Sequence, residues 1–310
     1  MSAPRRSIEL CPRSYDDMER AEVDELRVQF DSLPPVTVFQ DASLGIPGAV
    51  YDCSIALAAH LLDEVLPEAW HEHAAASRRA GPKILELGCG VGACGALVLA
   101  AAAARGVPLD VTLTDRNPGA LRLARRNVDA ALRDAAARDG SSSDTMCTAT
   151  ITPFDFADDP TAVLDARARP DVVLCSDVLY APESAAPLAR ALGALLRREP
   201  HASSNPTRGE SVLDASADAR APVCYLAWRP RPGNPNKISA VKAFLSACED
   251  ERLRAVDAST TSRADGERGV VARVWDANGD ERERGGWSAT FDPIEAAAKG
   301  LRVLKIERAA

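Results

Sequence analysis

The chain has 310 residues, of which 46% are hydrophobic and 26% charged, a composition typical of a globular protein that can bury a core. Its 45 acidic and 37 basic residues give a net charge of −8, which argues against non-specific nucleic-acid binding. No apolar run of about 18 residues predicts a membrane span. The N-terminus resembles neither a signal peptide nor a transit peptide, so we expect a cytoplasmic or nuclear protein. Eight scattered cysteines without a Cys-x-x-Cys pair favour reduced, buried thiols.

The N-terminal part of the chain divides into a lead-in and the start of a domain. Residues 1–35 are polar and predict an irregular or partly helical lead-in, and residues 36–310 are interpreted as one domain. Within that domain, residues 36–41 alternate like a strand and residues 43–50 are rich in turn formers. Residues 51–66 place apolar side chains on one helical face, and we expect Pro67 to end this helix.

From residue 81 onward, strand and helix patterns alternate along the chain. Strands are predicted at 84–87, 111–114, 147–151, 171–176 and 222–228, with helices between them and from 237 to 248. Asn117 is expected to cap one helix, with Pro118 at its first position. This alternation predicts a mostly parallel α/β sheet with helices on both faces. Segments 251–258 and 300–308 predict an antiparallel hairpin at its edge, completing a Rossmann-like sheet of seven strands.

Two stretches do not fit that alternating pattern. Residues 197–222 are polar without periodicity and predict a surface insertion. Residues 259–300 form a second insertion, in which we expect a hairpin turning at Asn278 and Gly279. The stretch "DANGDE" is similar to the start of a calcium loop, but Glu281 stands where that loop needs glycine. We therefore expect no metal site.

The glycine-rich turn "KILELGCGVGACGAL" (83–97) fits two cofactor templates. Gly88, Gly90 and Ala93 satisfy the dinucleotide fingerprint. Preceded by Glu86, the same glycines are similar to the first motif of S-adenosylmethionine-dependent methyltransferases. Asp115, at the tip of the next strand, can accept hydrogen bonds from both hydroxyls of an adenosine ribose. Because both cofactors contain that ribose, Asp115 does not discriminate between hydride transfer and methyl transfer.

The stretch "SDVLY" (176–180), directly after the fourth strand, favours methyl transfer. Its Asp177 and Tyr180 resemble the Asp-x-x-Tyr motif of the seven-strand protein lysine methyltransferases of methyltransferase family 16, which include the methyltransferase-like 21 group that acts on molecular chaperones. The segments "GAVYDCSIALAAHL" (48–61) and "LAWRPR" (226–231) are similar to the lead-in of that family and to the stretch after its fifth strand. The resemblance spans residues 36–258 and 301–308, and it implies a class I methyltransferase fold.

The resemblance also implies roles for individual residues around S-adenosylmethionine. Gly88, Cys89 and Gly90 would wrap its methionine part, Asp115 would hold its ribose, and Ser176 would lie against it. Glu86 would support the glycine turn or meet the amino group of the cofactor. The remaining positions are aromatic: Tyr51 replaces the lead-in tryptophan of the family, and Phe154, with Phe156 as the alternative, replaces a tryptophan near the adenine.

Asp177 and Tyr180 are the catalytic candidates, because they would recruit and orient the acceptor amine. The expected partner is a protein substrate, such as a chaperone or another abundant cytosolic protein, and the expected state is a monomer without membrane or nucleic-acid partners. Two alternatives stay open: a methyltransferase acting on a small molecule or nucleic acid, and a non-catalytic member that binds a partner. The stretch "SDVLY" lacks the two prolines of the Asn/Asp-Pro-Pro-Tyr motif expected of nucleic-acid N-methyltransferases.

Overall fold

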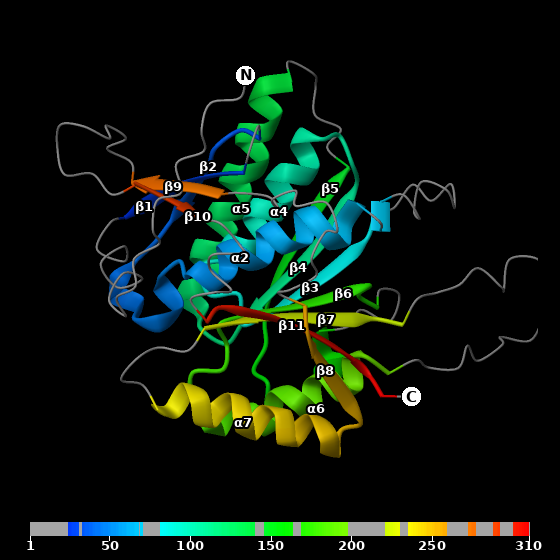
Figure 1. The fold of residues 1–310 in the computed structure, drawn as a ribbon. Coiled ribbons are helices and arrows are strands. Elements are labelled where there is room, and N and C mark those ends of the chain that lie inside the picture. The colour runs from blue at the N-terminus through cyan, green and yellow to red at the C-terminus, as the bar shows by residue number, and fades with distance from the viewer. Residues whose placement is uncertain are drawn as a thin grey trace, which may run out of the picture.

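The central element of the fold is a seven-stranded sheet with strand order β5-β4-β3-β6-β7-β11-β8 (Figure 1). The computed structural model describes residues 24–30, 33–67, 69–70, 81–139, 146–163, 169–197, 221–229, 235–258, 272–276, 288–291 and 300–309. The strands of this sheet are β3 (Lys83–Leu87), β4 (Leu109–Asp115), β5 (Cys147–Pro153), β6 (Val172–Ser176), β7 (Val223–Trp228), β8 (Leu253–Asp257) and β11 (Arg302–Arg308). Strands β5, β4, β3, β6 and β7 run parallel to one another, whereas β11 is antiparallel to both β7 and β8. The predicted parallel sheet with an antiparallel edge pair is therefore confirmed.

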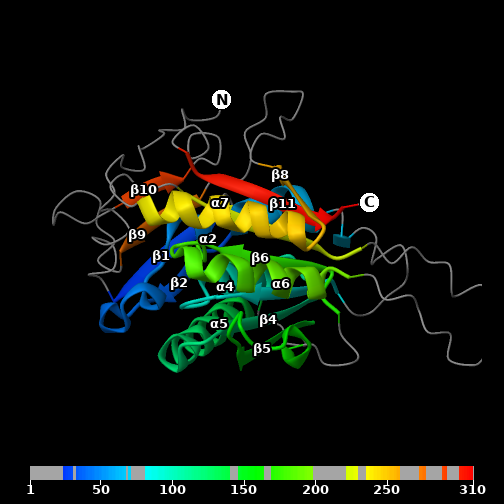
Figure 2. The same cartoon turned by 90° about the horizontal axis from the view of Figure 1, so that it is seen from below.

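Helices cover both faces of this sheet (Figures 1 and 2). One face carries α2 (Asp52–His60), α4 (Ala93–Ala104) and α5 (Pro118–Asp139), and the other carries α6 (Ala185–Leu195) and α7 (Pro235–Asp250). Successive side chains along a strand point to opposite faces of the sheet. Ile84 packs into the core under α2, α4 and α5, whereas Leu85 packs into the core under α6 and α7. This alternation explains why the central strands β3 and β6 are buried along almost their whole length.

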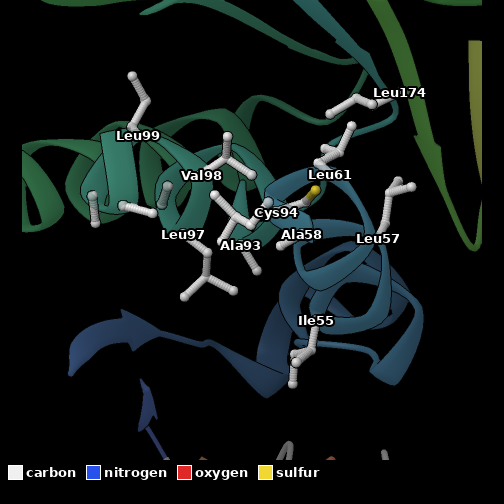
Figure 3. Close-up of a cluster of buried hydrophobic side chains, with 14 of the residues drawn as sticks. Ile55, Leu57, Ala58, Leu61, Ala93, Cys94, Leu97, Val98, Leu99 and Leu174 are labelled. Carbon is white, nitrogen blue, oxygen red and sulfur yellow. The ribbon is translucent and has the colours of Figure 1, made fainter. Parts of the chain in front are cut away.

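Helix α4 lies at the centre of the larger core, where it packs against α2 (Figure 3). Its residues from Ala93 to Ala103 are all buried, so it has no polar face. Alanines on α4 and on α2 allow the two helices to approach closely, and larger side chains fill the space between them. In Figure 3, Ala58 and Leu61 of the α2 segment lie beside Ala93, Cys94 and Val98 of α4, whereas Ile55, Leu57 and Leu99 point away from this contact into other parts of the core.

The ends of two helices test predictions made from the sequence. The Oδ1 atom of Asn117 accepts hydrogen bonds from the backbone N–H groups of Gly119 and Ala120, at 2.8 and 3.1 Å, which confirms the predicted cap of α5. The prediction that Pro67 ends the first helix is wrong, because Leu66 and Pro67 are still helical. A π turn at Leu61–Val65 precedes the proline. This wider turn accommodates a ring that would otherwise clash with the carbonyl four residues earlier.

A second, antiparallel sheet has the strand order β10-β9-β1-β2. Its strands are β1 (Glu25–Phe30), β2 (Val36–Phe39), β9 (Ala272–Asp276) and β10 (Ser288–Phe291), and β2 packs on α5. Strand β2 confirms the prediction for residues 36–41. Strand β1 corrects the expectation of an irregular or partly helical lead-in, because "ELRVQF" buries every second residue against the core. That period of two identifies a strand even inside a polar segment.

The predicted hairpin of the second insertion is present as the antiparallel pair β9 and β10, in which Trp275 lies opposite Ser288. Its predicted turn at Asn278 and Gly279 lies outside the described residues. Strand β9 also pairs with β1, so this insertion and the lead-in build one sheet. Most of the predicted insertion at 197–222 lies outside the described residues. The assignment of residues 36–310 to one domain stays a prediction.

Two properties of the described part of the chain concern its environment. Its seven cysteines are all free and buried, as the reduced-thiol interpretation expects. None of its helices is long and apolar enough to cross a bilayer.

Candidate active site

A cavity of about 720 Å³ opens at the carboxyl ends of β3, β4 and β6. This is the edge at which an open parallel sheet binds ligands, and the volume lies in the range of about 300–1,000 Å³ typical of small-molecule sites. Every predicted site residue except Glu86 lines the cavity. These residues are Tyr51, Gly88, Cys89, Gly90, Asp115, Phe154, Ser176, Asp177 and Tyr180.

The glycine turn after β3 forms one wall by backbone alone. Gly88 and Gly90 have φ angles of 66° and 53°, in the left-handed region that favours glycine. A Cβ atom on Gly88 would lie 2.8 Å from Cγ1 of Val178, and one on Gly90 would lie 3.1 Å from the carbonyl oxygen of Pro47. The turn therefore has space only for hydrogen atoms at these two positions, which lets the backbone approach a ligand closely.

Asp115 is fixed across the mouth of that turn by two backbone donors. Its Oδ2 accepts from the N–H of Gly90 at 2.9 Å, and its Oδ1 accepts from the N–H of Asn117 at 2.8 Å. Since Asn117 caps α5, Asp115 is not the capping residue of that helix. Its carboxylate is held on the cavity wall, where the second lone pairs of its oxygens can meet ligand hydroxyls.

Glu86 lies behind the glycine turn and not on the cavity wall. Its side chain is fully buried, and its Oε2 accepts from the N–H of Gly95 in α4 at 3.0 Å. Burial raises the pKa of Glu86 to about 8. Among the described residues, its Oε1 has no hydrogen-bond partner. Of the two interpretations from the sequence, this geometry favours support of the turn over contact with a cofactor.

Asn127 also supports the turn, and sequence reasoning missed it. This buried amide donates to the carbonyl oxygens of Val91 and Phe39, at 2.7 and 3.0 Å, and accepts from the N–H of Phe39 at 2.7 Å. It thereby ties α5 to the glycine turn and to strand β2. Its position on the buried face of an amphipathic helix is the only signal that the sequence offers.

Aromatic side chains line a second part of the cavity. The hydroxyl of Tyr51 donates to the carbonyl oxygen of Ile46 at 2.9 Å, which fixes its ring at the start of α2. Phe154 and Phe156 both line the cavity, with ring centroids 6.4 Å apart. Phe156 lies against the glycine turn, since its Cζ would be 3.2 Å from a Cβ on Gly88. The choice of Phe154 for the adenine contact stays a prediction.

Asp177 forms a buried ion pair that the sequence did not reveal. It follows β6 with a φ angle of 54°, and its N–H donates to the carbonyl oxygen of Ala227 at 2.9 Å. Its Oδ1 pairs with Nζ of Lys237, and the two side chains are only 4% and 1% exposed. Lys237 belongs to the first turn of α7 and is not among the described residues that line the cavity.

A second buried ion pair joins the two family-like segments found in the sequence. The Nη1 atom of Arg229, after β7, lies 2.7 Å from Oδ2 of Asp52, the first residue of α2. Their side chains are 14% and 4% exposed. The contact fixes the beginning of α2, and with it Tyr51, against the end of β7.

Ser176 offers a polar atom that a ligand can satisfy. Its hydroxyl is buried, lines the cavity and has no hydrogen-bond partner among the described residues. Buried polar groups are nearly always paired, so an orphaned hydroxyl on a cavity wall indicates a missing partner. Tyr180 and the exposed Glu183 line the cavity on the same side, beside the short helix η5 (Pro182–Ser184).

The sheet order, with the antiparallel strand β11 between β7 and β8, is that of the Rossmann-like class I methyltransferase fold, and the glycine turn and the carboxylate at the end of β4 lie where this fold binds its ligand. A sequence profile of the lysine methyltransferase family matches residues 31–205, which is more than half of the chain. The chain belongs to this family, and its cofactor is S-adenosylmethionine.

Solved structures that the chain is similar to include several methyltransferases. The DszA carbon methyltransferase has 16% identity and a TM-score of 0.38, over 74% of this chain and 47% of that one. Magnesium protoporphyrin IX methyltransferase from Synechocystis with bound SAH has 13% identity and a TM-score of 0.34, over 84% and 89%. SAH-bound PaMTH1 from Podospora anserina has 11% identity and a TM-score of 0.34, over 84% and 89%. The chain spans about half the length of the DszA enzyme. No curated protein sequence matches it.

The residues present fit this cofactor on three counts. The cavity is large enough for a nucleoside with an amino-acid tail. The glycine turn leaves backbone room that a Cβ at Gly88 or Gly90 would fill. The orphaned hydroxyl of Ser176 provides a hydrogen-bonding partner inside the cavity.

Proposed function

We propose that this enzyme transfers a methyl group from S-adenosylmethionine to the side-chain amine of a lysine in a protein substrate. One observation carries the proposal. Asp177 and Tyr180, the residues that the family resemblance assigns to the acceptor, line the same cavity as the glycine turn. The segment proposed to bind the methyl donor and the segment proposed to bind the acceptor amine therefore line one cavity. The description of the matching family, lysine methyltransferase, supports the same substrate class.

In this proposal, one side of the cavity holds the methyl donor. Gly88, Cys89 and Gly90 wrap its methionine part, and Asp115 accepts from its ribose hydroxyls. Ser176 hydrogen-bonds to it, and Tyr51 and Phe154 contribute aromatic surface, with Phe154 at the adenine. Glu86 contributes indirectly, because its contact with Gly95 fixes α4 behind the turn.

The other side of the cavity prepares the acceptor. When bound, the cofactor supplies a sulfonium methyl group: the nitrogen lone pair forms the new C–N bond while the C–S bond breaks and leaves its electrons on sulfur. A lysine amine with an ordinary pKa of about 10.4 is neutral in only roughly one molecule in 2,500 at pH 7, a barrier contribution of about 4.6 kcal/mol. Asp177 and Tyr180 orient the neutral amine, and alignment provides much of the acceleration.

Charge on the cavity wall supports a cationic substrate side chain. The carboxylates of Asp115 and Glu183 line the cavity, together with those of Asp155 and Asp177, which form ion pairs with Arg116 and Lys237. Arg116 is the one basic residue among the described lining residues. A cleft lined mainly by one sign of charge concentrates ligands of the opposite sign. An exposed lysine of a chaperone or another abundant cytosolic protein has this chemistry, and the enzyme would act as a monomer.

The test uses purified enzyme, S-adenosylmethionine with a labelled methyl group, and a lysate of the source cells. We expect label in a discrete protein band with wild-type enzyme, and a loss of at least about a thousandfold with Asp177→Ala. Calorimetry should show that this variant binds S-adenosylhomocysteine within a few-fold of wild type, because Asp177 contacts the acceptor. Label only in small molecules or nucleic acid, or equal transfer by the variant, would contradict the proposal.

A further inference from the structure

Lys237 occupies a position that is unfavourable for a lysine. Its side chain is 1% exposed, and it belongs to the first turn of α7, a helix of 16 residues. Burial removes the hydration of the ammonium group, and the positive end of the helix dipole lies next to it. Its ion pair with Asp177 offsets this cost, which points to that contact as the reason for a lysine here.

The ion pair between Lys237 and Asp177 joins a residue of the cavity wall to a residue outside the described cavity lining. Asp177 lines the cavity, whereas Lys237 is absent from the described lining residues. The backbone of Asp177 has a φ angle of 54°, an unfavourable value for a residue other than glycine. The contacts that hold it there include the hydrogen bond from its N–H to Ala227 and the ion pair of its Oδ1 with Lys237. Asp177 thus lines the cavity, while one oxygen of its carboxylate pairs with a buried ammonium group that lies outside the described lining.

A carboxylate without such a cation would oppose the reaction of the proposed function. An opposite charge near the acceptor amine stabilises its ammonium form. The ammonium form has no lone pair and cannot attack a methyl group. An ion pair has no net charge, so it can orient the amine while stabilising its ammonium form much less.

We propose that Lys237 is a positioning residue that holds the Asp177 carboxylate on the cavity wall and offsets its negative charge, so that the acceptor amine stands beside Asp177 in its neutral, nucleophilic form. The inference rests on the proposed function of Asp177 as the group that orients the amine. The ammonium proton leaves to bulk water before transfer, and the nitrogen lone pair then forms the C–N bond. Lys237 touches neither the acceptor nor the donor, and it acts through Asp177.

Other titratable groups share the surroundings of Asp177 and stay constant in the test. Those on the cavity wall are Tyr51, Cys89, Asp115, Arg116, Asp155, Tyr180 and Glu183. The Asp52–Arg229 pair lies beyond the end of β7, the strand to which the N–H of Asp177 is bonded. Since no variant below changes these groups, differences between variants report on Lys237.

The test is the pH profile of kcat with the labelled protein band as acceptor. For Lys237→Met, we expect the half-maximal pH to rise by about one to three units, with at least a tenfold loss of kcat at pH 7 that is regained at high pH. KM for the acceptor at pH 7 should stay the same or fall, because the Asp177 carboxylate attracts a cation more strongly without the positive charge of Lys237. Lys237→Arg keeps the charge and should keep the profile at the wild-type pH. A Lys237→Met profile parallel to wild type at every pH would overturn the inference.

A binding measurement separates this inference from the proposed function. The probe is n-butylammonium, an analogue of the lysine side chain, titrated at pH 7 into the complex with S-adenosylhomocysteine and followed by NMR. We expect Lys237→Met to bind it several-fold more tightly than wild type does. Equal or weaker binding would overturn the role of Lys237 even where lysine methylation is established. Absence of lysine methylation by wild type would overturn the proposed function and leave the binding result as the test of charge offset.

Two further variants control for structural damage. Lys242→Met removes an exposed lysine from the same helix, and we expect it to match wild type in all readouts. Lys237→Gln can still donate a hydrogen bond to Asp177 but carries no charge, so it should shift the pH profile as Lys237→Met does, even if Lys237→Met does not fold. A wild-type profile for Lys237→Gln would show that the hydrogen bond and not the charge matters, and would contradict the inference.

Discussion

Two walls of the same cavity are built in different ways. The glycine-turn wall, with Gly88, Gly90, Asp115 and Ser176, is shaped mainly by backbone and held by hydrogen bonds to backbone N–H groups. On the ion-pair wall, Tyr51 and Asp177 line the cavity and are fixed by the pairs Asp52–Arg229 and Asp177–Lys237. The first wall lets a ligand approach the backbone closely. The second fixes charged side chains, whose effect depends on pH and on the partner behind each of them.

The largest expected effect comes from breaking an ion pair. Asp52→Ala leaves the largely buried Arg229 without its carboxylate, which should lower the free energy of unfolding by about 3–5 kcal/mol. Because the pair holds the start of α2, turnover should fall while the affinity for S-adenosylhomocysteine changes less. Urea unfolding and calorimetry measure the two quantities.

The matched control for that change is an exposed ion pair. Arg254 pairs with Glu307 between β8 and β11, and its side chain is 64% exposed. Arg254→Met should cost less than about 1 kcal/mol, because solvent screens such pairs. Equal losses for Asp52→Ala and Arg254→Met would show that burial does not distinguish the ion-pair wall from the surface.

The next effect tests the glycine-turn wall. Gly88→Ala places a methyl group 2.8 Å from Cγ1 of Val178 at a φ angle of 66°, so the turn must shift. We expect the affinity for S-adenosylhomocysteine to fall at least about a hundredfold, which corresponds to about 2.7 kcal/mol. Gly106→Ala is the control, since Gly106 has a φ angle of 64° but nothing within 4 Å of the added atom. It should cost stability of about 1 kcal/mol and leave binding unchanged. Similar affinities of Gly88→Ala and Gly106→Ala for S-adenosylhomocysteine would contradict the claim that the ligand approaches the backbone of the glycine turn closely.

The smallest expected effect concerns the buried carboxyl behind the glycine turn. The pKa of Glu86 is raised to about 8, so the folded state keeps a proton that the unfolded state releases. Stability from this group is therefore full below about pH 4.5 and is lost as the pH rises through about 8. Glu86→Gln removes that dependence, but it buries an amide without a partner at a cost of about 1–3 kcal/mol. The net gain at pH 7 should be about 1–2 kcal/mol.

Thermal unfolding of wild type and Glu86→Gln across pH 5–9 checks this expectation. The difference in stability should grow in favour of the variant over this range. If Glu86 instead met the cofactor, the variant would lose affinity for S-adenosylhomocysteine by tenfold or more. A constant stability difference across the range would contradict the burial of an ionisable group.

The two walls also differ in how many of their contacts could be predicted from the sequence. The glycine turn and Asp115 lie within 25 residues of each other, on consecutive strand ends, so a local pattern was enough to bring them together. The ion pairs join residues 60 and 177 positions apart. Lys237 follows a stretch rich in proline, glycine and arginine, in which a lysine resembles a surface residue. Only the tertiary structure places its side chain under Asp177.

The same contrast applies to the fold. The clearest strand signals of the main sheet were buried apolar runs such as that of β6, and the alternation of strands with helices implies parallel pairing. The second sheet was missed as a unit, because β1 and β9 lie in segments interpreted as a lead-in and an insertion. Their pairing joins residues such as Val28 and Val274, which no local pattern connects.

The central claim is that the cavity methylates a lysine amine, and the most direct measurement identifies the methylated amino acid. Protein labelled by the wild-type enzyme would be hydrolysed completely, and the label followed through amino-acid analysis and mass spectrometry. We expect the label in methylated lysine, and none above background with Asp177→Ala. Label in methylated arginine or histidine, or in a base-labile ester, would contradict the claim.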